Sequence, residues 1–289
     1  MSAQGRSIEQ FADSAALLEF KARTMARGLQ TGKHLSSRLG QGMEFHSYRN
    51  YVQGDDLRLV DWKRYAKTGE YFIRQSTIER SQHLHIDLDI STSMDYQEQA
   101  TSKLALATLI TGCLTYVISQ QGDGYSWRAG DSYFQRSFGL HNWRRSIIDL
   151  DKIASSNSTF VNPSHQNSSQ EGITIWITDL YMDRSVVEDY IARNTGPHVE
   201  LCIIHLIGRN EEELSFDANT KFVDLESGEK LQVNTKQYAE QYQTVLSGHL
   251  ADIKKLCLEK KTIIHKIYLD DDLPMALRQF LSVYNQLSN

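Results

Sequence analysis

The sequence predicts an α/β protein built on a doubly wound, mostly parallel sheet. Between residues 81 and 289, strand-like apolar runs alternate with helix-like segments, and this alternation is typical of a parallel sheet covered by helices on both faces. The run Leu84–Ile90 alternates apolar and polar residues, whereas Ile173–Thr178 is rich in β-branched and aromatic residues. Asp89 and Asp179 lie where these two runs end. Ligands bind at the carboxyl ends of strands in such sheets, so we expect a site there.

The remaining elements of this unit follow from periodicity and from turn residues. Strands are expected near Leu84–Ile90, Gly124–Arg128, Ser132–Phe138, Ile173–Thr178, Val199–Ile207 and Ile263–Ile267. Helices are expected near Gln99–Gln121, Trp143–Ala154, Ser185–Arg193 and Gln237–Lys260. Two short strands around Ser227-Gly228 should form a hairpin between Lys221 and Val233.

Residues 1–80 form the first of two predicted units, and residues 81–289 form the second. Apolar residues recur three and four apart over Ile8–Gln30, which predicts an amphipathic helix that docks on the body of the protein. Tyr71–Gln75 is expected to be a strand, so the first unit contains this helix and a small β-containing segment.

An Asp-x-Ser-x-Ser run leaves the first strand of the second unit. Asp89, Ser91 and Ser93 place three oxygen-bearing side chains two residues apart, and a hard ion such as Mg²⁺ prefers oxygen ligands. Thr159 and Asp179, which follow later segments, can supply further oxygens. Together these five residues resemble the metal-ion-dependent adhesion site of von Willebrand factor A-type domains, which have a Rossmann-like fold. We expect Mg²⁺ there, with Mn²⁺ or Ca²⁺ as alternatives.

A second motif lies upstream, in the runs Glu44–Tyr51, Gly54–Arg58 and Asp61–Lys63. It is similar to the signature of the bacterial domain-of-unknown-function 58 family, whose members pair it with a von Willebrand A-like domain. We assign an interaction or structural role to Arg49, Tyr51, Gly54, Asp55, Asp56, Arg58, Asp61 and Trp62. The glycine and two aspartates should form a tight turn that holds one of the arginines. Trp62, with Tyr65 and Phe72, should pack this segment on the larger unit because the three rings are apolar.

The resemblance implies a function as well as a fold. Members of that family are typically encoded beside MoxR-type AAA+ ATPases. We therefore expect a metal-dependent protein-interaction or adaptor module that works with such an ATPase in the maturation or remodelling of a client protein. An ion held by one aspartate and two hydroxyls is only partly neutralised, so it favours a carboxylate from a partner as its last ligand.

Two other functions compete with this one. In a metal-dependent hydrolase the ion would activate a water, with Asp87 as the base. We expect no enzyme, because the chain has no nucleophile elbow and no phosphate-binding loop. The Tyr48–Arg80 segment interleaves basic and aromatic residues, as single-strand nucleic-acid binders do. The formal net charge of -5 and the acidic residues within that segment argue against this alternative.

The strand before the metal loop is unusual, because His83, His85 and Asp87 alternate with its apolar residues. This pattern resembles the start of a zinc-hydrolase motif, but Leu88 stands where the next histidine belongs. We instead expect the strand to lie near a sheet edge or under the N-terminal segment. The chain has no apolar run long enough to span a membrane and no apolar signal core, so we expect it in the cytoplasm.

Overall fold

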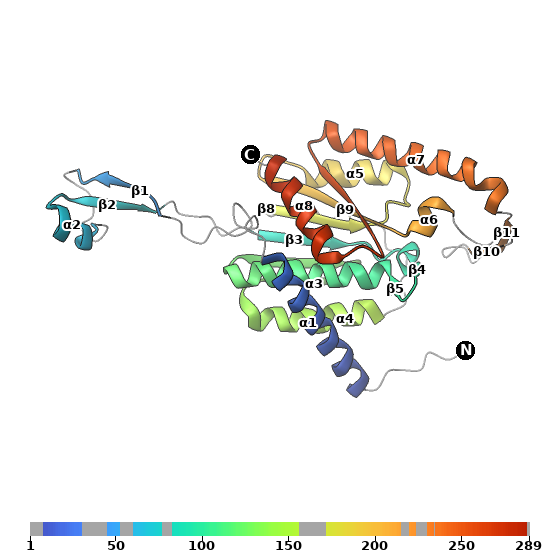
Figure 1. Cartoon of the computed structure of the whole chain (residues 1–289), viewed down its shortest axis with the longest axis horizontal. Coiled ribbons are helices and arrows are strands. Elements are labelled where there is room, and N and C mark those ends of the chain that lie inside the picture. Colours follow the sequence, from blue (N-terminus) through green and yellow to red (C-terminus); the bar gives the residue numbers. More distant parts are fainter. Residues whose placement is uncertain are drawn as a thin grey trace.

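A computed structural model of the chain describes residues 8–30, 45–52, 60–76, 83–155, 172–214, 220–223, 230–233 and 235–287. Its centre is a six-stranded sheet in the order β12-β9-β8-β3-β6-β7 (Figure 1). Parallel pairing joins β3 (His83–Leu88), β6 (Gly124–Ala129), β8 (Gly172–Thr178), β9 (Val199–Ile207) and β12 (Ile263–Tyr268). The edge strand β7 (Ser132–Ser137) runs antiparallel to β6. The predicted doubly wound, mostly parallel sheet is therefore confirmed, and it is consistent with a Rossmann-like von Willebrand A arrangement.

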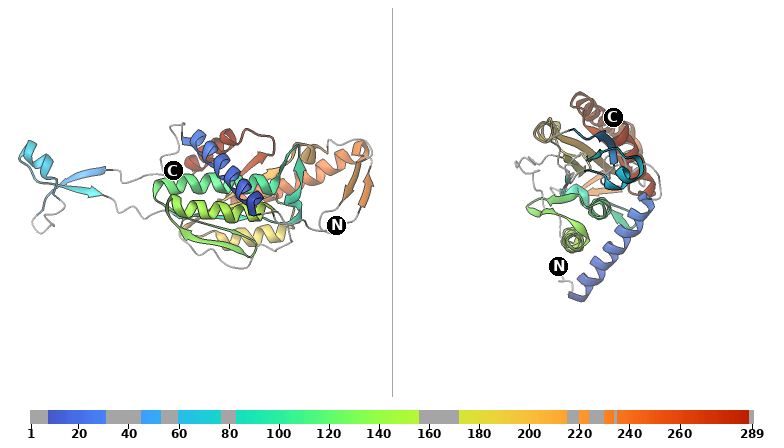
Figure 2. Two further views of the ribbon diagram at one scale, coloured as in Figure 1. Left: turned by 90° about the horizontal axis from the view of Figure 1, so that it is seen from below. Right: turned by 90° about the vertical axis from the view of Figure 1, so that its left-hand side faces the viewer.

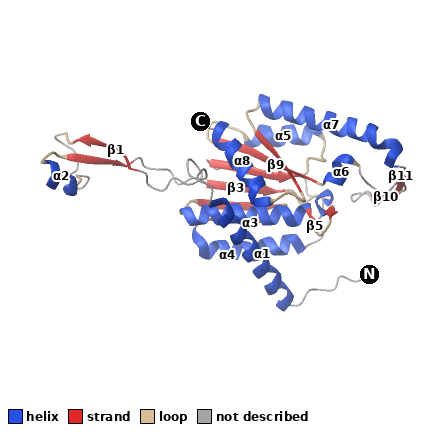
Figure 3. Ribbon diagram, viewed as in Figure 1, coloured by secondary structure: helices blue, strands red, loops and turns tan. Residues whose placement is uncertain are grey.

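Helices cover both faces of this sheet (Figures 1 and 3). One face packs against α3 (Lys103–Gln121) and α8 (Leu273–Leu287), with α4 (Gly139–Ser155) beside α3. The other face packs against α5 (Arg184–Asn194) and α7 (Thr235–Glu259). Alternate residues of each strand point to opposite faces, so the two faces have separate apolar clusters.

The N-terminal helix α1 (Ile8–Gln30) packs on α3, α4 and α8, as its amphipathic stripe predicted. Ala22, Ala26 and Leu29 are fully buried in the core of the larger unit. The contact is close at Gly112 of α3, where a Cβ would come within 3.2 Å of the Cβ of Ala22. The indole Nε1–H of Trp143 donates to the carbonyl of Gly112 over 3.0 Å, which ties α4 to the same point. Helix α1 is thus part of the hydrophobic core of the larger unit, which residues 81–289 form.

Among the described residues, α3 is the one helix long and apolar enough to cross a membrane by length and composition. Protein surrounds 78% of the window that meets this test. The position of α3 between the sheet and helices α1 and α4 explains why the helix is apolar. Its apolar sequence is therefore only weak evidence for a membrane span.

Two strands and a short helix form a separate small element, drawn apart from the six-stranded sheet in Figures 1 and 2. Strands β1 (Phe45–Asn50) and β2 (Phe72–Ser76) pair antiparallel. Helix α2 (Trp62–Thr68) begins at Asp61, whose side chain accepts from the backbone N–H of Arg64. It ends at Gly69, whose φ of 74° only glycine adopts without strain. The β-containing segment is confirmed, and Asp61 serves as its helix cap.

The expectation that Trp62 packs this segment on the larger unit is wrong. Its side chain is 54% exposed, and Tyr71 is 44% exposed. The aromatic rings contact one another instead: Tyr65 stacks on Tyr71 with ring centroids 4.3 Å apart, and Trp62 meets both edge-on. Tyr51 donates its backbone N–H to the carbonyl of Tyr71. Gly54, Asp55, Asp56 and Arg58, and the side chain of Arg49, lie outside the described residues.

Most predicted elements of the larger unit lie within a few residues of their expected bounds. Strand β9 matches exactly the expected range, and the hairpin of β10 (Thr220–Val223) and β11 (Lys230–Val233) is confirmed. Helix α3 begins at Lys103 rather than Gln99, because the short strands β4 (Gln97–Glu98) and β5 (Thr101–Ser102) form a hairpin before it. Helix α6 (Arg209–Glu213), between β9 and β10, was not predicted.

The two tryptophans Trp143 and Trp62 give a matched test of this architecture. Trp143→Ala should lower the free energy of unfolding by about 3–5 kcal/mol, since a fully buried ring and its hydrogen bond are lost. Trp62→Ala should cost less than about 1 kcal/mol, because half of that side chain already faces water. Urea unfolding followed by circular dichroism measures both. Equal losses would mean that Trp62 is part of the core after all.

Candidate functional site

The candidate site lies at the carboxyl edge of the sheet, between β3 and β8. From β3 the chain crosses to β6 on one side, and from β8 it crosses to β9 on the other side. This divergence makes the β3–β8 boundary the switch point of the sheet, where ligands bind in open α/β folds. The backbone N–H of Asp89 donates to the carbonyl of Ile177 over 2.9 Å. The pairing therefore brings Asp89 and Asp179 to the same edge, as the sequence predicted.

The loop after β3 gathers three oxygen-bearing side chains. Asp89 is buried, and its Oδ1 accepts from the backbone N–H of Ser91 over 2.8 Å. Its Oδ2 accepts from the hydroxyl of Thr178, the last residue of β8, over 2.7 Å. The hydroxyls of Ser91 and Ser93 lie 3.0 Å apart. Asp89, Ser91 and Ser93 are thus brought together, and Thr178 is a supporting residue that the sequence analysis missed.

Asp179 pairs with a lysine that the sequence analysis also missed. The ammonium of Lys103, at the start of α3, lies 2.9 Å from Asp179 Oδ2 and 2.7 Å from Glu211 Oε1 of α6. Lys103 is fully buried, and its Nζ lies 4.7 Å from the ring centroid of Tyr181 and 5.2 Å from that of Tyr96. The available sequence signal was a lysine in the first turn of an otherwise apolar helix that directly follows the metal loop.

The electrostatics of the site favour a cation at Asp89. Burial raises the pKa of Asp89, the charge of Asp179 raises it further, and the hydrogen bond from Ser91 opposes both. Burial likewise raises the pKa of Glu211, against the effect of Lys103. The hydrogen-bond donors to Asp89 among the described residues, Ser91 and Thr178, carry no positive charge, and a bound cation would supply one.

The oxygens of Asp89, Ser91 and Ser93 suit Mg²⁺, which accepts a few protein oxygens and keeps waters for its other positions. Within the described part of the chain, no group of three or more His, Cys, Asp or Glu side chains is arranged to hold a metal. Among these described residues, a metal site at Asp89 therefore depends on the two serine hydroxyls. Thr159, the fifth predicted ligand, lies outside the described residues.

The polar side chains of β3, which are His83, His85 and Asp87, have hydrogen-bond partners inside the protein. Asp87 accepts two hydrogen bonds from Arg128 at 2.8 and 2.9 Å, one from the hydroxyl of Tyr190, and a 3.0 Å contact from His85 Nε2. Although burial raises the pKa of Asp87, these partners lower it below its usual 3.8. Such a carboxylate is a poor general base.

The predicted position of β3 near a sheet edge is wrong, because β3 is a central strand with β8 and β6 on either side. Its polar side chains are tolerated there because β6 and α5 carry partners for them. The hydroxyl of Ser126 on β6 lies 2.9 Å from His83 Nε2 and 2.7 Å from His85 Nδ1.

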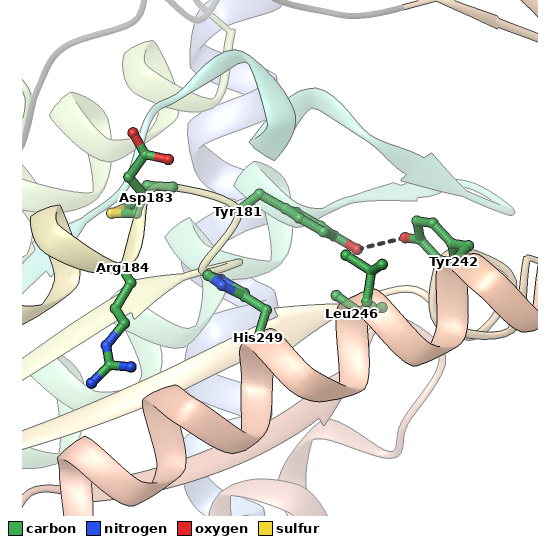
Figure 4. A pocket seen from close by; sticks show the side chains of 8 residues that line it. Tyr181, Asp183, Arg184, Tyr242, Leu246 and His249 are labelled. Atoms are coloured by element: carbon green, nitrogen blue, oxygen red, sulfur yellow. Dashed lines mark hydrogen bonds between the residues drawn. The ribbon is translucent and has the colours of Figure 1, made fainter.

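A cavity of about 330 Å³ opens beside the site, between the β8–α5 loop and helix α7 (Figure 4). Its walls are formed by Tyr181, Met182, Asp183, Arg184, Tyr242, Val245, Leu246 and His249. The hydroxyls of Tyr181 and Tyr242 lie 3.2 Å apart across one end. Tyr181 thus borders the cavity while its ring contacts Lys103. Leu180, between Asp179 and Tyr181, has a φ of 59°, a strained conformation that is frequent at functional sites.

Comparison with known proteins identifies a family. Residues 47–251 match the family described as "Protein of unknown function DUF58". Uncharacterized protein Rv1480 of Mycobacterium tuberculosis (strain ATCC 25618 / H37Rv) and Uncharacterized protein Mb1516 of Mycobacterium bovis (strain ATCC BAA-935 / AF2122/97) are each 30% identical over 106 residues. That region covers 37% of this chain and 33% of each relative, so the match spans about a third of their length.

Two solved structures resemble the chain at low similarity. The conserved hypothetical protein BatB from Bacteroides thetaiotaomicron gives a TM-score of 0.40 at 14% identity, over 71% of this chain and 99% of that one. An aerotolerance-related membrane protein from Bacteroides fragilis NCTC 9343, with multiple mutations to serines, gives 0.40 at 12% identity, over 70% and 99%.

The metal assignment predicts a specific loss on removing one charge. Asp89→Asn keeps the size of the side chain and one acceptor oxygen, but it removes the carboxylate charge. Mn²⁺ or Mg²⁺ binding, measured by calorimetric titration, should weaken by at least roughly a hundredfold. Asp131→Asn, which alters an exposed aspartate in the β6–β7 turn, should bind like the natural protein. Unchanged affinity in Asp89→Asn would exclude Asp89 as a ligand.

A second prediction concerns acid stability and His205 of β9. Burial lowers the pKa of His205 from its usual 6.5 to about 4. Between pH 6.5 and pH 4 the unfolded chain therefore binds more protons than the native protein. The contribution of His205 to the free energy of unfolding is fully present above pH 6.5, and it is lost, by about 3 kcal/mol, as the pH is lowered toward 4. Urea unfolding at stepped pH should show a flatter fall in His205→Gln. His141→Gln, at an exposed position of α4, should keep the natural slope. Parallel curves for His205→Gln and the natural protein would refute the assignment.

Proposed function

We propose that this chain, which belongs to the DUF58 family of proteins of unknown function, is a metal-dependent protein-interaction module rather than an enzyme. The supporting observation is the cluster of Asp89 with the hydroxyls of Ser91 and Ser93 at the switch point of the sheet. Those residues would hold Mg²⁺, or Mn²⁺ or Ca²⁺ in its place, with Thr159 as a further ligand. The ion would supply a positive charge that binds a carboxylate of another protein.

The cavity beside the site supports a protein as the ligand. An acidic side chain bound at the metal would lie next to Tyr181, and a neighbouring apolar side chain of the same partner would fill the space between Tyr242, Val245 and Leu246. Val245 is 67% exposed, so this part of the wall is open to a partner. We propose a MoxR-type AAA+ ATPase, or the client that it remodels, as that partner.

A metal-dependent hydrolase has less support. The candidate base that the sequence offered, Asp87, is buried and is bound by Arg128, Tyr190 and His85. A base must reach a water beside the metal with a free lone pair and a pKa near the working pH. Asp87 meets neither condition.

One observation still favours the alternative function, nucleic-acid binding. The exposed rings of Trp62 and Tyr71 lie beside the exposed lysines Lys63 and Lys67 of α2, and aromatic rings with basic side chains bind single strands. The net charge of -5 remains unfavourable for it. A labelled oligonucleotide titrated at two salt concentrations tests this alternative, since phosphate contacts weaken with salt.

Partner binding should depend on the metal. The affinity for the MoxR-type ATPase of the same organism, measured by biolayer interferometry, should fall at least about thirtyfold with chelator or in Asp89→Asn, because an interfacial carboxylate loses its counter-charge. Asp131→Asn should bind normally. Equal binding in all these conditions would reject the metal site as the docking point. In that case Trp62→Ala decides whether the aromatic cluster of α2 and β2 is the docking surface.

A further inference from the structure

We infer that Lys103 is a built-in cation of the site, which holds Asp179 away from the bound metal and so leaves the ion dependent on a partner's carboxylate. This inference rests on the proposed function. Lys103 is the single lysine or arginine that is buried among the described residues, and it is buried completely. A buried ammonium is stable only where opposite charges and hydrogen-bond acceptors surround it.

The partners of Lys103 come from two separate parts of the chain. Asp179 and Tyr181 lie in the loop after β8, and Glu211 belongs to α6; the ring centroid of Tyr181 lies 4.7 Å from the ammonium. Both oxygens of Asp179 are engaged: Oδ2 accepts from Lys103, and Oδ1 accepts from the backbone N–H of Tyr181 over 3.3 Å. Asp179 is therefore paired with a cation and oriented without a metal.

Asp89 is in a different position from Asp179, although both carboxylates are buried at the same edge. The partners that Asp89 has in the described part of the chain are a backbone N–H and the hydroxyl of Thr178, which carry no net charge. Of the two aspartates at this edge, only Asp89 would therefore place its full negative charge beside a divalent ion. The charge of Asp179 is instead directed at Lys103, which it shares with Glu211. The ion would stay net positive and attract an external carboxylate.

A purely structural lysine makes a different prediction. If Lys103 only stabilised α3, β8 and α6, changes at Lys103 and at Asp179 would alter folding but would not compensate each other in metal affinity. If Lys103 is the counter-charge of Asp179, removing both groups together leaves the net charge near the ion unchanged. Removing either one alone shifts that charge in opposite directions.

The test is a titration with Mn²⁺ alone, followed by the electron paramagnetic resonance signal of the free ion. It compares the natural protein with Asp179→Asn, Lys103→Gln and the double variant, each checked for folding by circular dichroism. Asp179→Asn removes one of the two carboxylate charges beside the ammonium, which makes the surroundings of the ion more positive, and it should weaken binding by roughly tenfold or more. The double variant should return to within about threefold of the natural affinity. Lys103→Gln should bind roughly tenfold tighter.

The comparison of Asp179→Asn with the double variant decides the inference even if Lys103→Gln alone does not fold. Equal loss of affinity in those two variants would make Asp179 a direct ligand and overturn the inference, while the proposed function stands. Absence of Mn²⁺ binding in every protein would overturn both. Binding by Lys103→Gln but not by the natural protein would support the role of Lys103 as the cation of the site.

Discussion

The ion pairs of Lys103 are the interaction on which this edge of the molecule depends. A completely buried ammonium costs several kcal/mol to desolvate, and its partners must be held in place by the fold. Here one partner follows β8 and the other lies in α6, which follows β9, so a single side chain of α3 connects both ends of the β8–α5–β9 unit. The helix α6 is only five residues long, and its Glu211 also accepts from the backbone N–H of Gly208. A helix this short is not stable alone, and Lys103 is one of the contacts that hold it, together with Lys266 and Tyr268, which both bond to Glu212.

The central strand carries a second buried charge, and the protein satisfies it by a different arrangement. Asp87 is bound on one side by Arg128 of the neighbouring strand and on the other by Tyr190 of α5. This contact fixes α5 on the sheet just as Lys103 fixes α6. Asp87 lies on β3 and Asp89 in the loop that follows it, but the partners of the two carboxylates differ in kind. Asp87 has a cationic partner that saturates it, whereas Asp89 has neutral donors that leave its charge available. That difference identifies Asp89, and not Asp87, as the residue for a metal.

The sequence was sufficient for the features that depend on local periodicity and on topology. Strand β9 and the convergence of Asp89 with Asp179 follow from apolar runs and from the rule that parallel strands end at one edge. It was insufficient where the outcome depends on tertiary partners. The sequence around Lys103 does not establish that it is buried, because its partner Glu211 is far away in the chain and comes close only in the folded protein. The row of His83, His85 and Asp87 resembled an edge strand, because the compensating Ser126 and Arg128 are some forty residues away in the chain. Trp62 was expected in a core because its ring is apolar, yet neighbouring tyrosines cover only part of it.

Tyr181 is the residue through which the charge of the site and the shape of the cavity are connected. Its ring contacts the ammonium of Lys103, its backbone N–H donates to Asp179, and its hydroxyl meets that of Tyr242 on α7. The strained backbone at Leu180 sets the direction of the chain between Asp179 and this ring, and His249 of α7 contacts the carbonyl of Leu180 at 2.9 Å. A partner that fills the cavity would press on the same loop that orients Asp179. Because Asp179 and Lys103 share a hydrogen bond, such pressure would alter the field at Asp89 without any change in the metal ligands themselves. Recognition of the apolar part and of the acidic part of a partner would therefore be cooperative, and the physical basis of that cooperativity is this one loop of three residues.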